Sequence, residues 1–528
     1  MTRFTERDFP GAWEIVAAIV PLVSLVSLVI LAVSVFGGDV CGGASQISLL
    51  LATAIAAVMA RTVGRKSWKD VENGIVKAVS NVTVSVLILL LIGMLSGAWM
   101  VSGVVPTIIV YGVQVVRPGF FLVAAAIVSA VVALVTGTSW STCATIGVAL
   151  MGIGSTLGIP PAWSAGAIIS GAYFGDKLSP LSDTTILASS STGVELFSHV
   201  RYMLRTTVPT FLITIAVFAV AGGTMATGTE NAEKCVEGLS SVFAITPWAL
   251  NIPLATLTLI ALRVPTLAVL FASALLAGGF ALVFQRPILL SIAGDSAPSA
   301  IGLYKAVMTV FFGSTGVETG NELLNRLVAT RGMAGMLDTV WLILIAAAFG
   351  GVMYVGGMLR TIAQLVVACV RGTLGLVGAT AFMGTLMNVA MGDQYLAILV
   401  TADVFRDVYR SKGYEPRLLS RTIEDSCTVT SVLVPWNTCA MAQSASLGVA
   451  TLEYAPFCFF NFLSPLVTVC VAALGWGIVQ DRDLIARGMK PDVKFGGRQK
   501  AFNEVQFDGE FTDLKGEIEY VNEKVREG

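Results

Sequence analysis

The sequence predicts an all-α polytopic membrane protein made of two inverted-topology repeats, each with a re-entrant hairpin and a broken transmembrane helix. Composition and an internal repeat predict it. Of 528 residues, 55% are hydrophobic and 13% are charged, and the mean hydropathy is +0.81. A chain with this small share of charged residues could not cover a soluble hydrophobic core with polar surface. It is therefore expected to cross a bilayer in about ten full spans, each of about 20 apolar residues.

Charge and histidine content exclude several function classes. The net charge is −1, so the chain lacks the excess of positive charge that would indicate nucleic-acid binding. The one histidine, His199, is placed in a short basic loop, so no zinc, haem or histidine-dependent catalytic site is expected in the membrane. We expect a non-enzyme with no cofactor and no transition metal. Cys41 and Cys235 fall in loops placed outside, and a disulfide between them is left open.

Charged loops set the expected topology. The apolar run 13–36 is too long for a signal-peptide core and is interpreted as an uncleaved helix. Cations around residues 61–77 place that loop, and therefore the N-terminus, in the cytoplasm. The segments 199–205 and 404–421 are also placed inside, and the acidic segment 229–237 outside. The polar C-terminal end is expected to be a cytoplasmic tail.

An internal repeat underlies the fold prediction. Residues 97–117 align with 351–371, and one further residue of offset aligns the Gly and Pro positions that follow. Gly and Pro set backbone shape, so matching positions indicate matching folds. The basic loop of each copy corresponds to uncharged residues in the other. The copies should therefore cross the membrane in opposite directions, as in secondary transporters that rock around a midplane site.

Five segments are expected along the chain. They are N-terminal helices with a basic loop (1–78), repeat 1 (79–223), linking helices and loops (224–335), repeat 2 (336–480) and the cytoplasmic tail (481–528). In repeat 1 the hairpin tip is placed at 136–142 and the broken helix at 163–197. In repeat 2 they are placed at 391–395 and 422–452.

Glycine and proline mark the expected interruptions. Gly137 and Gly392 lie at the hairpin tips, and Pro180 and Pro435 lie mid-span among hydroxyls and amides. A proline removes a backbone donor and frees a carbonyl, which leaves two half-helices and an unwound stretch that must line protein or a cavity. Carbonyl, hydroxyl and carboxylate oxygens there would suit Na⁺, whereas opposed helix N-termini would suit an anion.

Intramembrane charge costs about 2.5–3.5 kcal/mol per group, which makes each such carboxylate a functional candidate. The candidates for ion or proton binding are Asp183, Asp393, Asp176, Thr138, Ser139, Ser182, Thr184, Gln394, Asp425, Asn437 and Thr438. Asp183 and Asp393 are preferred, and both broken regions should meet near the membrane centre. For Asp176, helix capping or a pair with Lys177 is an equal alternative, and for Glu424 an interfacial pair with Arg421 is preferred.

At these segments the chain resembles the NhaC family of sodium/proton antiporters. The resemblance is carried by residues 137–140, 167–185, 392–395, 424–426 and 435–439 and covers about residues 10–480. It implies the ion-transporter superfamily fold and exchange of Na⁺, or Li⁺, for H⁺ across a bacterial inner membrane. Ile186 departs from the pattern, because a polar Asn is expected there. Nothing in the sequence excludes a homodimer.

Other functions stay as alternatives. Similar proteins exchange organic acids such as malate and lactate together with Na⁺ and H⁺, so an organic-acid exchanger on the same scaffold is the second hypothesis. Its anion site would need a midplane cation, for which Lys177 is the first candidate, before Arg360 and Arg371. An intramembrane protease is disfavoured because Gly392-Asp393 and Gly137-Thr138-Ser139 lack the rest of the catalytic motifs.

Overall fold

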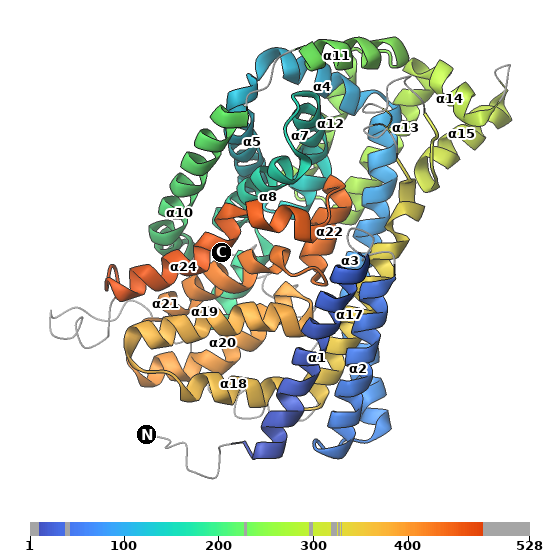
Figure 1. The fold of residues 1–528 in the computed structure, drawn as a ribbon. Coiled ribbons are helices and arrows are strands. Elements are labelled where there is room, and N and C mark those ends of the chain that lie inside the picture. Colours follow the sequence, from blue (N-terminus) through green and yellow to red (C-terminus); the bar gives the residue numbers. More distant parts are fainter. Residues whose placement is uncertain are drawn as a thin grey trace.

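A computed structural model describes residues 10–36, 43–225, 230–294, 299–317, 325, 328 and 330–478. In these ranges every regular element is a helix, as Figure 1 shows, which confirms the all-α prediction. Within this part of the chain, eight helices are long and apolar enough to cross a membrane, or up to ten if each of two bent pairs counts as one span. The protein is therefore a multi-pass membrane protein.

The first half of the chain forms ten α-helices. They are α1 (Ala12–Phe36), α2 (Ala44–Thr62), α3 (Trp68–Val101), α4 (Val104–Val115), α5 (Phe121–Thr136), α6 (Ser139–Thr142), α7 (Val148–Thr156), α8 (Pro161–Leu178), α9 (Asp183–Thr192) and α10 (Leu196–Met225). A π-helical turn, η4 (Cys143–Gly147), joins α6 to α7.

The connection between the repeats is also helical. It contains α11 (Glu230–Val242), η5 (Pro247–Leu250), α12 (Asn251–Ala261), α13 (Thr266–Phe284), α14 (Arg286–Ala293) and α15 (Ala300–Phe312). The acidic segment expected to be an outside loop lies mostly within α11, so the loop prediction is wrong there.

The second half repeats the pattern of the first. Its elements are η6 (Gly332–Met336), α17 (Leu337–Val355), α18 (Met358–Ala368), α19 (Gly372–Met391), α20 (Gln394–Ser411), α21 (Pro416–Ile423), η7 (Glu424–Thr428), η8 (Ser431–Leu433), α22 (Thr438–Leu447), α23 (Thr451–Tyr454), η9 (Ala455–Phe457) and α24 (Phe459–Ala473). Of these, η7 is a second π-helical turn.

Element boundaries confirm the internal repeat. With an offset of 255 residues, α9 (183–192) falls on α22 (438–447) from first residue to last. The segment from α6 to α7 (139–156) falls on α20 (394–411) in the same way. The single helix α8 (161–178) corresponds to the chain from α21 to η8 (416–433), which the π turn interrupts. Both copies therefore fold alike, and they differ in where a π turn was inserted.

The two copies run in opposite directions. Helices α3 and α17 are equivalent and lie side by side. Gly74, early in α3, lies against Val355 at the end of α17, whereas Gly93, late in α3, lies against Gly332 before α17. The helices are therefore antiparallel, and α3 continues into α4 at the top of Figure 1 while α17 continues into α18 at the bottom. This arrangement is the expected inverted topology.

Small residues bring α5 and α8 into direct backbone contact. A Cβ added at Gly171 or Gly175 would collide with the α5 backbone at Ala126 and Ala130. A small-xxx-small spacing of this kind lets membrane helices approach closely. The contact fixes the C-terminal end of α8 beside the end of α5, so the break after α8 lies next to the tip after α5.

Several predictions fall outside the described residues. These are the cytoplasmic placement of both termini, the tail at 481–528, and the pairing of Cys41 with Cys235, because Cys41 is not among the described residues. The basic loop predicted over 61–77 is wrong in extent: only residues 63–67 connect α2 to α3, Arg61 lies at the end of α2, and Lys69 and Lys77 lie in α3.

Candidate functional site

Each hairpin tip is a glycine in the left-handed conformation, followed by a residue that caps the next helix. Gly137 ends α5 with φ +70°, and Gly392 ends α19 with φ +64°. The side chain of Thr138 accepts a hydrogen bond from the backbone N–H of Ser141 at the start of α6. At the equivalent position, Asp393 Oδ1 accepts from the N–H of Leu396 at 3.0 Å. Both tips therefore present an oxygen at a helix N-terminus.

Each predicted break is an unwound stretch that contains the expected proline. The first separates α8, which ends at Leu178, from α9, which begins at Asp183. The second separates η8 from α22, whose cap is Asn437: its Oδ1 accepts from the N–H of Cys439 at 3.0 Å. Pro180 and Pro435 occupy matching places in these stretches.

Tip and break touch one another in both repeats. Gly137 lies against the backbone of Leu181, and Gly392 lies against the carbonyl of Trp436, the residue equivalent to Leu181. In repeat 2 the contact includes hydrogen bonds. The Thr438 N–H donates to the Gly392 carbonyl at 2.8 Å, and the Thr438 hydroxyl donates to Asp393 Oδ2 at 3.3 Å.

A second contact crosses from the tip to the helix before the break. Asp176 Oδ2 accepts from the Ser139 N–H at 2.9 Å. At the equivalent positions of repeat 2, the Ser431 hydroxyl donates to Gln394 Oε1 at 3.2 Å. The carboxylate of repeat 1 is therefore replaced by a hydroxyl in repeat 2, although the place of contact is the same. Asp176 contacts the tip, and the alternative pair with Lys177 does not form.

Substituting the tip glycines should destabilise the protein to different degrees. The left-handed conformation costs an L-residue about 1–2 kcal/mol, so Gly→Ala should cost about that much at either tip. At Gly137 the new Cβ would also lie 2.8 Å from Leu181 atoms, whereas at Gly392 the nearest atom, the Trp436 carbonyl oxygen, is 3.1 Å away. In thermal unfolding experiments in detergent, the melting temperature of Gly137→Ala should therefore be lower than that of Gly392→Ala.

Gly413→Ala is the matched control for these variants. Gly413 has φ +69° and no atom within 4 Å of an added Cβ, so it reports the backbone cost alone. Equal melting temperatures for Gly413→Ala and Gly137→Ala would contradict the close approach of tip and break.

Carboxylates from both repeats lie near one tyrosine. The phenol of Tyr395, in the first turn of α20, is close enough to Asp176, Asp183 and Asp393 to interact electrostatically with all three. Tyr395 lies within the predicted hairpin tip (391–395) but is not among the site residues predicted from the sequence. Its position directly after the Asp-Gln pair is the signal that could have identified it. The two tips and two breaks thus bring their polar groups toward a common region.

The three aspartates differ in exposure. Asp176 and Asp393 are buried, with 6% and 7% of their surface exposed, whereas Asp183 is exposed. No described residue hydrogen-bonds to the Asp183 carboxylate, and α9 has no side-chain cap. Nearby, the hydroxyls of buried Ser182 and Thr184 lie 3.0 Å apart. Asp183 therefore offers two unpaired carboxylate oxygens to a cation or a proton.

A cavity of about 240 Å³ leads to Asp393. Its walls come from α3, α17 and the tip of repeat 2, and include Gly350 and Met391. The exposed side chains of Lys66, which precedes α3, and Asp70, in its first turn, also line it. Asp393 can therefore be reached from the end of the molecule that carries the first basic segment.

The described residues contain no cluster of three or more His, Cys, Asp or Glu side chains suited to holding one metal ion. A cation at this site would therefore need hydroxyl, amide and backbone oxygens in addition to a carboxylate. The tips and breaks supply such oxygens, among them those of Thr138, Thr438 and Asn437.

A second polar cluster lies beside the site. Lys177 forms an ion pair with Asp425, and both side chains are fully buried. Asp425, one of the predicted ion ligands, is therefore paired with a cation of repeat 1 in this conformation. Arg421 Nε lies 3.8 Å from Asp425 Oδ2. Among the described residues Arg421 forms no ion pair with Glu424, and both side chains are fully buried, so the expected interfacial pair is wrong. In the part of the chain that the structure describes, neither Glu424 oxygen has a hydrogen-bond partner.

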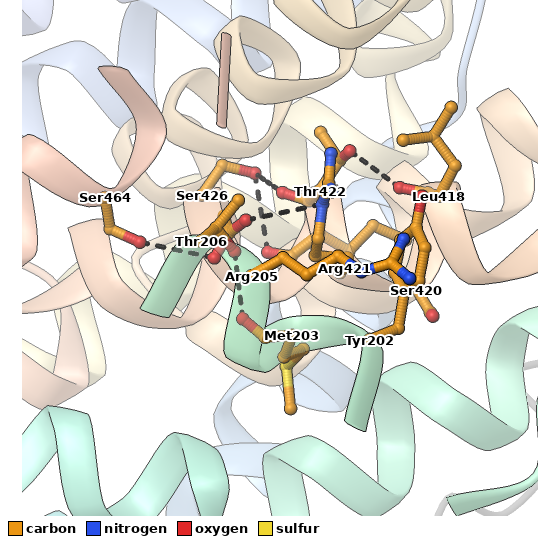
Figure 2. Close-up of polar contacts among 12 residues, drawn as sticks. Tyr202, Met203, Arg205, Thr206, Leu418, Ser420, Arg421, Thr422, Ser426 and Ser464 are labelled. Atoms are coloured by element: carbon orange, nitrogen blue, oxygen red, sulfur yellow. Dashed lines mark hydrogen bonds and ion pairs between the residues drawn. The ribbon is translucent and has the colours of Figure 1, made fainter. Parts of the chain in front are cut away.

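His199 is part of this cluster, so its placement in a loop is wrong. It lies in the first turn of α10, is fully buried, and its Nδ1 is 2.8 Å from the Ser420 hydroxyl. Figure 2 shows Arg421 directed toward Tyr202 of α10, with its guanidinium carbon 4.9 Å from the ring centroid. Residues 199–205 are helical because buried and charged positions alternate with helical spacing.

Comparison with known proteins gives consistent matches over most of the chain. The model of the Na⁺/H⁺ antiporter family matches residues 4–190 and 171–476. The Na⁺/H⁺ antiporter NhaC of Alkalihalophilus pseudofirmus is 36% identical over 83% of this chain and 92% of its own length. NhaC of Bacillus subtilis is 35% identical over 76% and 87%. The malate-2H⁺/Na⁺-lactate antiporter of Bacillus subtilis is 35% identical over 79% and 87%.

Proposed function

Because the chain belongs to the Na⁺/H⁺ antiporter family, we propose that it exchanges Na⁺ for H⁺ across the membrane by alternating access. The observation that carries the proposal is that Asp176 and Asp183 of repeat 1 and Asp393 of repeat 2 all lie close enough to Tyr395 to interact with it electrostatically. The proposed ligands of the cation are Asp393 and Asp183, supported by the surrounding hydroxyl and amide oxygens. Asp176 positions the tip of repeat 1 by accepting the hydrogen bond from the Ser139 N–H.

The exchange follows from competition for the same oxygens. Removal from water disfavours a charged carboxylate, so a buried aspartate binds a proton more readily than one in water. A Na⁺ ion beside it favours the charged form and displaces the proton. A site that opens alternately to the two sides then converts this competition into exchange. The cavity that reaches Asp393 is the proposed aqueous route on one side.

The organic-acid alternative has weaker support at this site. It needs a cation that faces the substrate, and the first candidate, Lys177, is paired with Asp425 and fully buried. The other candidates, Arg360 and Arg371, are exposed at the ends of α18 and α19 rather than beside Tyr395. The charge arrangement therefore favours a bare cation as substrate.

Transport by the purified protein tests the proposal. In proteoliposomes that contain a pH-sensitive dye, an inward Na⁺ gradient should raise the internal pH and an outward Na⁺ gradient should lower it. Protein-free vesicles should show neither change. Labelled malate or lactate should not move under the same gradient. Uptake of either acid with Na⁺ as the co-substrate would instead support the alternative, and absence of any Na⁺-dependent proton movement would contradict the main proposal.

The membrane location is a further part of the proposal. We infer a bacterial inner membrane and cytoplasmic termini from the basic segments and from the family. Repeats 1 (79–223) and 2 (336–480) would then carry the transport site. Reporter fusions after residues 8 and 500 should both be active in the cytoplasm, and an external reporter at either end would contradict this topology.

A further inference from the structure

A fully buried asparagine, Asn388, connects several parts of the repeat 2 half of the site. It lies in α19, one turn before the tip glycine, and none of its surface is exposed. Its Nδ2 donates to the Cys427 carbonyl in η7 at 2.6 Å and to the Thr430 hydroxyl at 3.0 Å. The other end of the amide faces the break, where Asn437 Nδ2 donates to Asn388 Oδ1 at 3.3 Å. The side chain therefore bridges the break and the helical segment before it.

The backbone at Asn388 contacts both the tip and the break. Its carbonyl accepts from the N–H of Gly392, the tip glycine, at 3.2 Å and from Asn437 Nδ2 at 3.3 Å. The carbonyl of the next residue, Val389, accepts from the indole Nε1 of Trp436 at 2.7 Å. Trp436 and Asn437 are consecutive residues of the break, so the end of α19 binds the break through two side-chain donors.

Fixing Asn437 also fixes the residue after it. Asn437 Oδ1 accepts from the Cys439 N–H at 3.0 Å, so both ends of its amide are hydrogen-bonded. Thr438 donates its N–H to the Gly392 carbonyl and its hydroxyl to Asp393, a proposed ligand of the cation. An amide held at both ends keeps one orientation, and this orientation keeps Thr438 beside Asp393.

Repeat 1 lacks this arrangement. With the 255-residue offset, Asn388 corresponds to Ala133 of α5, whose side chain cannot form hydrogen bonds. Among the described residues, one side chain of the first break donates to α5: the Ser179 hydroxyl bonds the carbonyl of Leu134, the residue equivalent to Val389, at 2.8 Å. The repeat 2 half of the site is therefore held in more places than the repeat 1 half.

We propose that Asn388 is a positioning residue for cation binding: it holds the break of repeat 2 in its binding geometry before the ion arrives. A site whose ligands are already in place does not have to order them when the ion binds, so its affinity is higher. Asn388 acts through Asn437 and Thr438 and is not itself a ligand. The inference rests on the proposed Na⁺/H⁺ exchange and concerns the affinity of its cation site.

The Na⁺ dependence of exchange in proteoliposomes tests the inference. Asn388→Ala gives repeat 2 the residue that repeat 1 has at this position. The Na⁺ concentration at half-maximal rate should rise about 10-fold, which corresponds to about 1.4 kcal/mol, the net contribution of about one hydrogen bond. The maximal rate per folded protein should stay close to that of the wild type, because the proposed carboxylate ligands remain.

Asn461→Ala is the matched control. Asn461, in α24, is also fully buried, and its Nδ2 donates at 2.9 Å to the carbonyl of Val429, two residues after Cys427. Among the described residues it makes no hydrogen bond to the tip or to the break. This variant should lower the melting temperature, as Asn388→Ala does, but should leave the half-maximal Na⁺ concentration unchanged.

The two measurements separate positioning from stability. If Asn388→Ala melts at a lower temperature but keeps the half-maximal Na⁺ concentration of the wild type, Asn388 only stabilises the fold and the inference is overturned. Absence of Na⁺-dependent proton movement in the wild-type protein would instead overturn the proposed function.

Hydrogen–deuterium exchange of the wild-type protein decides the question if Asn388→Ala does not fold. Without Na⁺, the backbone amides of 434–440 should exchange more slowly than those of 179–185, because the second break is already held. Addition of Na⁺ should then slow exchange mainly in 179–185. Equal exchange in the two segments without Na⁺ would overturn the inference.

Discussion

Asp393→Asn should reduce Na⁺-dependent proton movement in proteoliposomes to the level of protein-free vesicles. Asparagine cannot bind and release a proton, but its Oδ1 can still accept the hydrogen bond from the Leu396 N–H that caps α20. Asp183→Asn should have the same effect on exchange, and because no described residue hydrogen-bonds to Asp183, it should not lower the melting temperature. Transport and thermal unfolding measured on the same preparations separate the two effects.

Asp338→Asn is the control for both variants, because Asp338 is exposed in the first turn of α17. Wild-type exchange with an unshifted pH profile in both Asp393→Asn and Asp183→Asn would show that the coupling carboxylate lies elsewhere. Asp176, which is buried against the tip of repeat 1, would then be the next residue to replace.

Breaking the ion pair between Lys177 and Asp425 should be the most destabilising single change. Removing one partner of a buried pair leaves a charge without compensation and typically costs about 3–5 kcal/mol. Lys177→Met and Asp425→Leu should therefore each lower the free energy of unfolding by about that amount. The double variant should recover much of the loss, since a buried pair replaced by apolar side chains is often neutral.

A double-mutant cycle measures this coupling by chemical unfolding in detergent. If the losses in free energy of unfolding of the two single variants simply add in the double variant, the two side chains do not compensate one another. Arg421 is the residue to watch, because it also lies near Asp425 and would lose a neighbouring negative charge. The double variant should therefore recover only part of the lost free energy of unfolding. Full recovery would mean that another group compensates the charge of Arg421.

Much of the fold could be predicted because its decisive features are local. A glycine followed by polar residues between apolar runs predicts a tip, and a proline among hydroxyls predicts a break. Both occur twice at the same spacing, so the repeat and its interruptions were visible in the sequence. The acids at those interruptions, Asp393 and Asp183, were selected for the same reason.

The rest depends on contacts between distant residues. Lys177 lies next to Asp176 in sequence but pairs with Asp425, which is 248 residues away. Neighbours in a helix point in different directions, so adjacency did not predict the partner. The π turn that contains Glu424 and Asp425 had no distinctive sequence signal.

His199 was a different kind of error, because its pattern was readable. The buried residues His199, Tyr202, Met203 and Thr206 follow helical spacing, and the exposed Arg201 and Arg205 lie between them. Two arginines suggested a loop, whereas the spacing indicated a helix with one buried face. The charge content was given more weight than the periodicity.

The repeat also bears on ion valence. At three equivalent positions, an acid of one copy is replaced by a hydroxyl in the other: Asp393 corresponds to Thr138, Asp183 to Thr438, and Asp176 to Ser431. Acids kept in both copies would double the negative charge around Tyr395, and oxygen cages rich in carboxylates are those that bind Ca²⁺. Alternating acid and hydroxyl between the copies halves that charge while keeping the number of oxygens, which favours a monovalent ion over a divalent one.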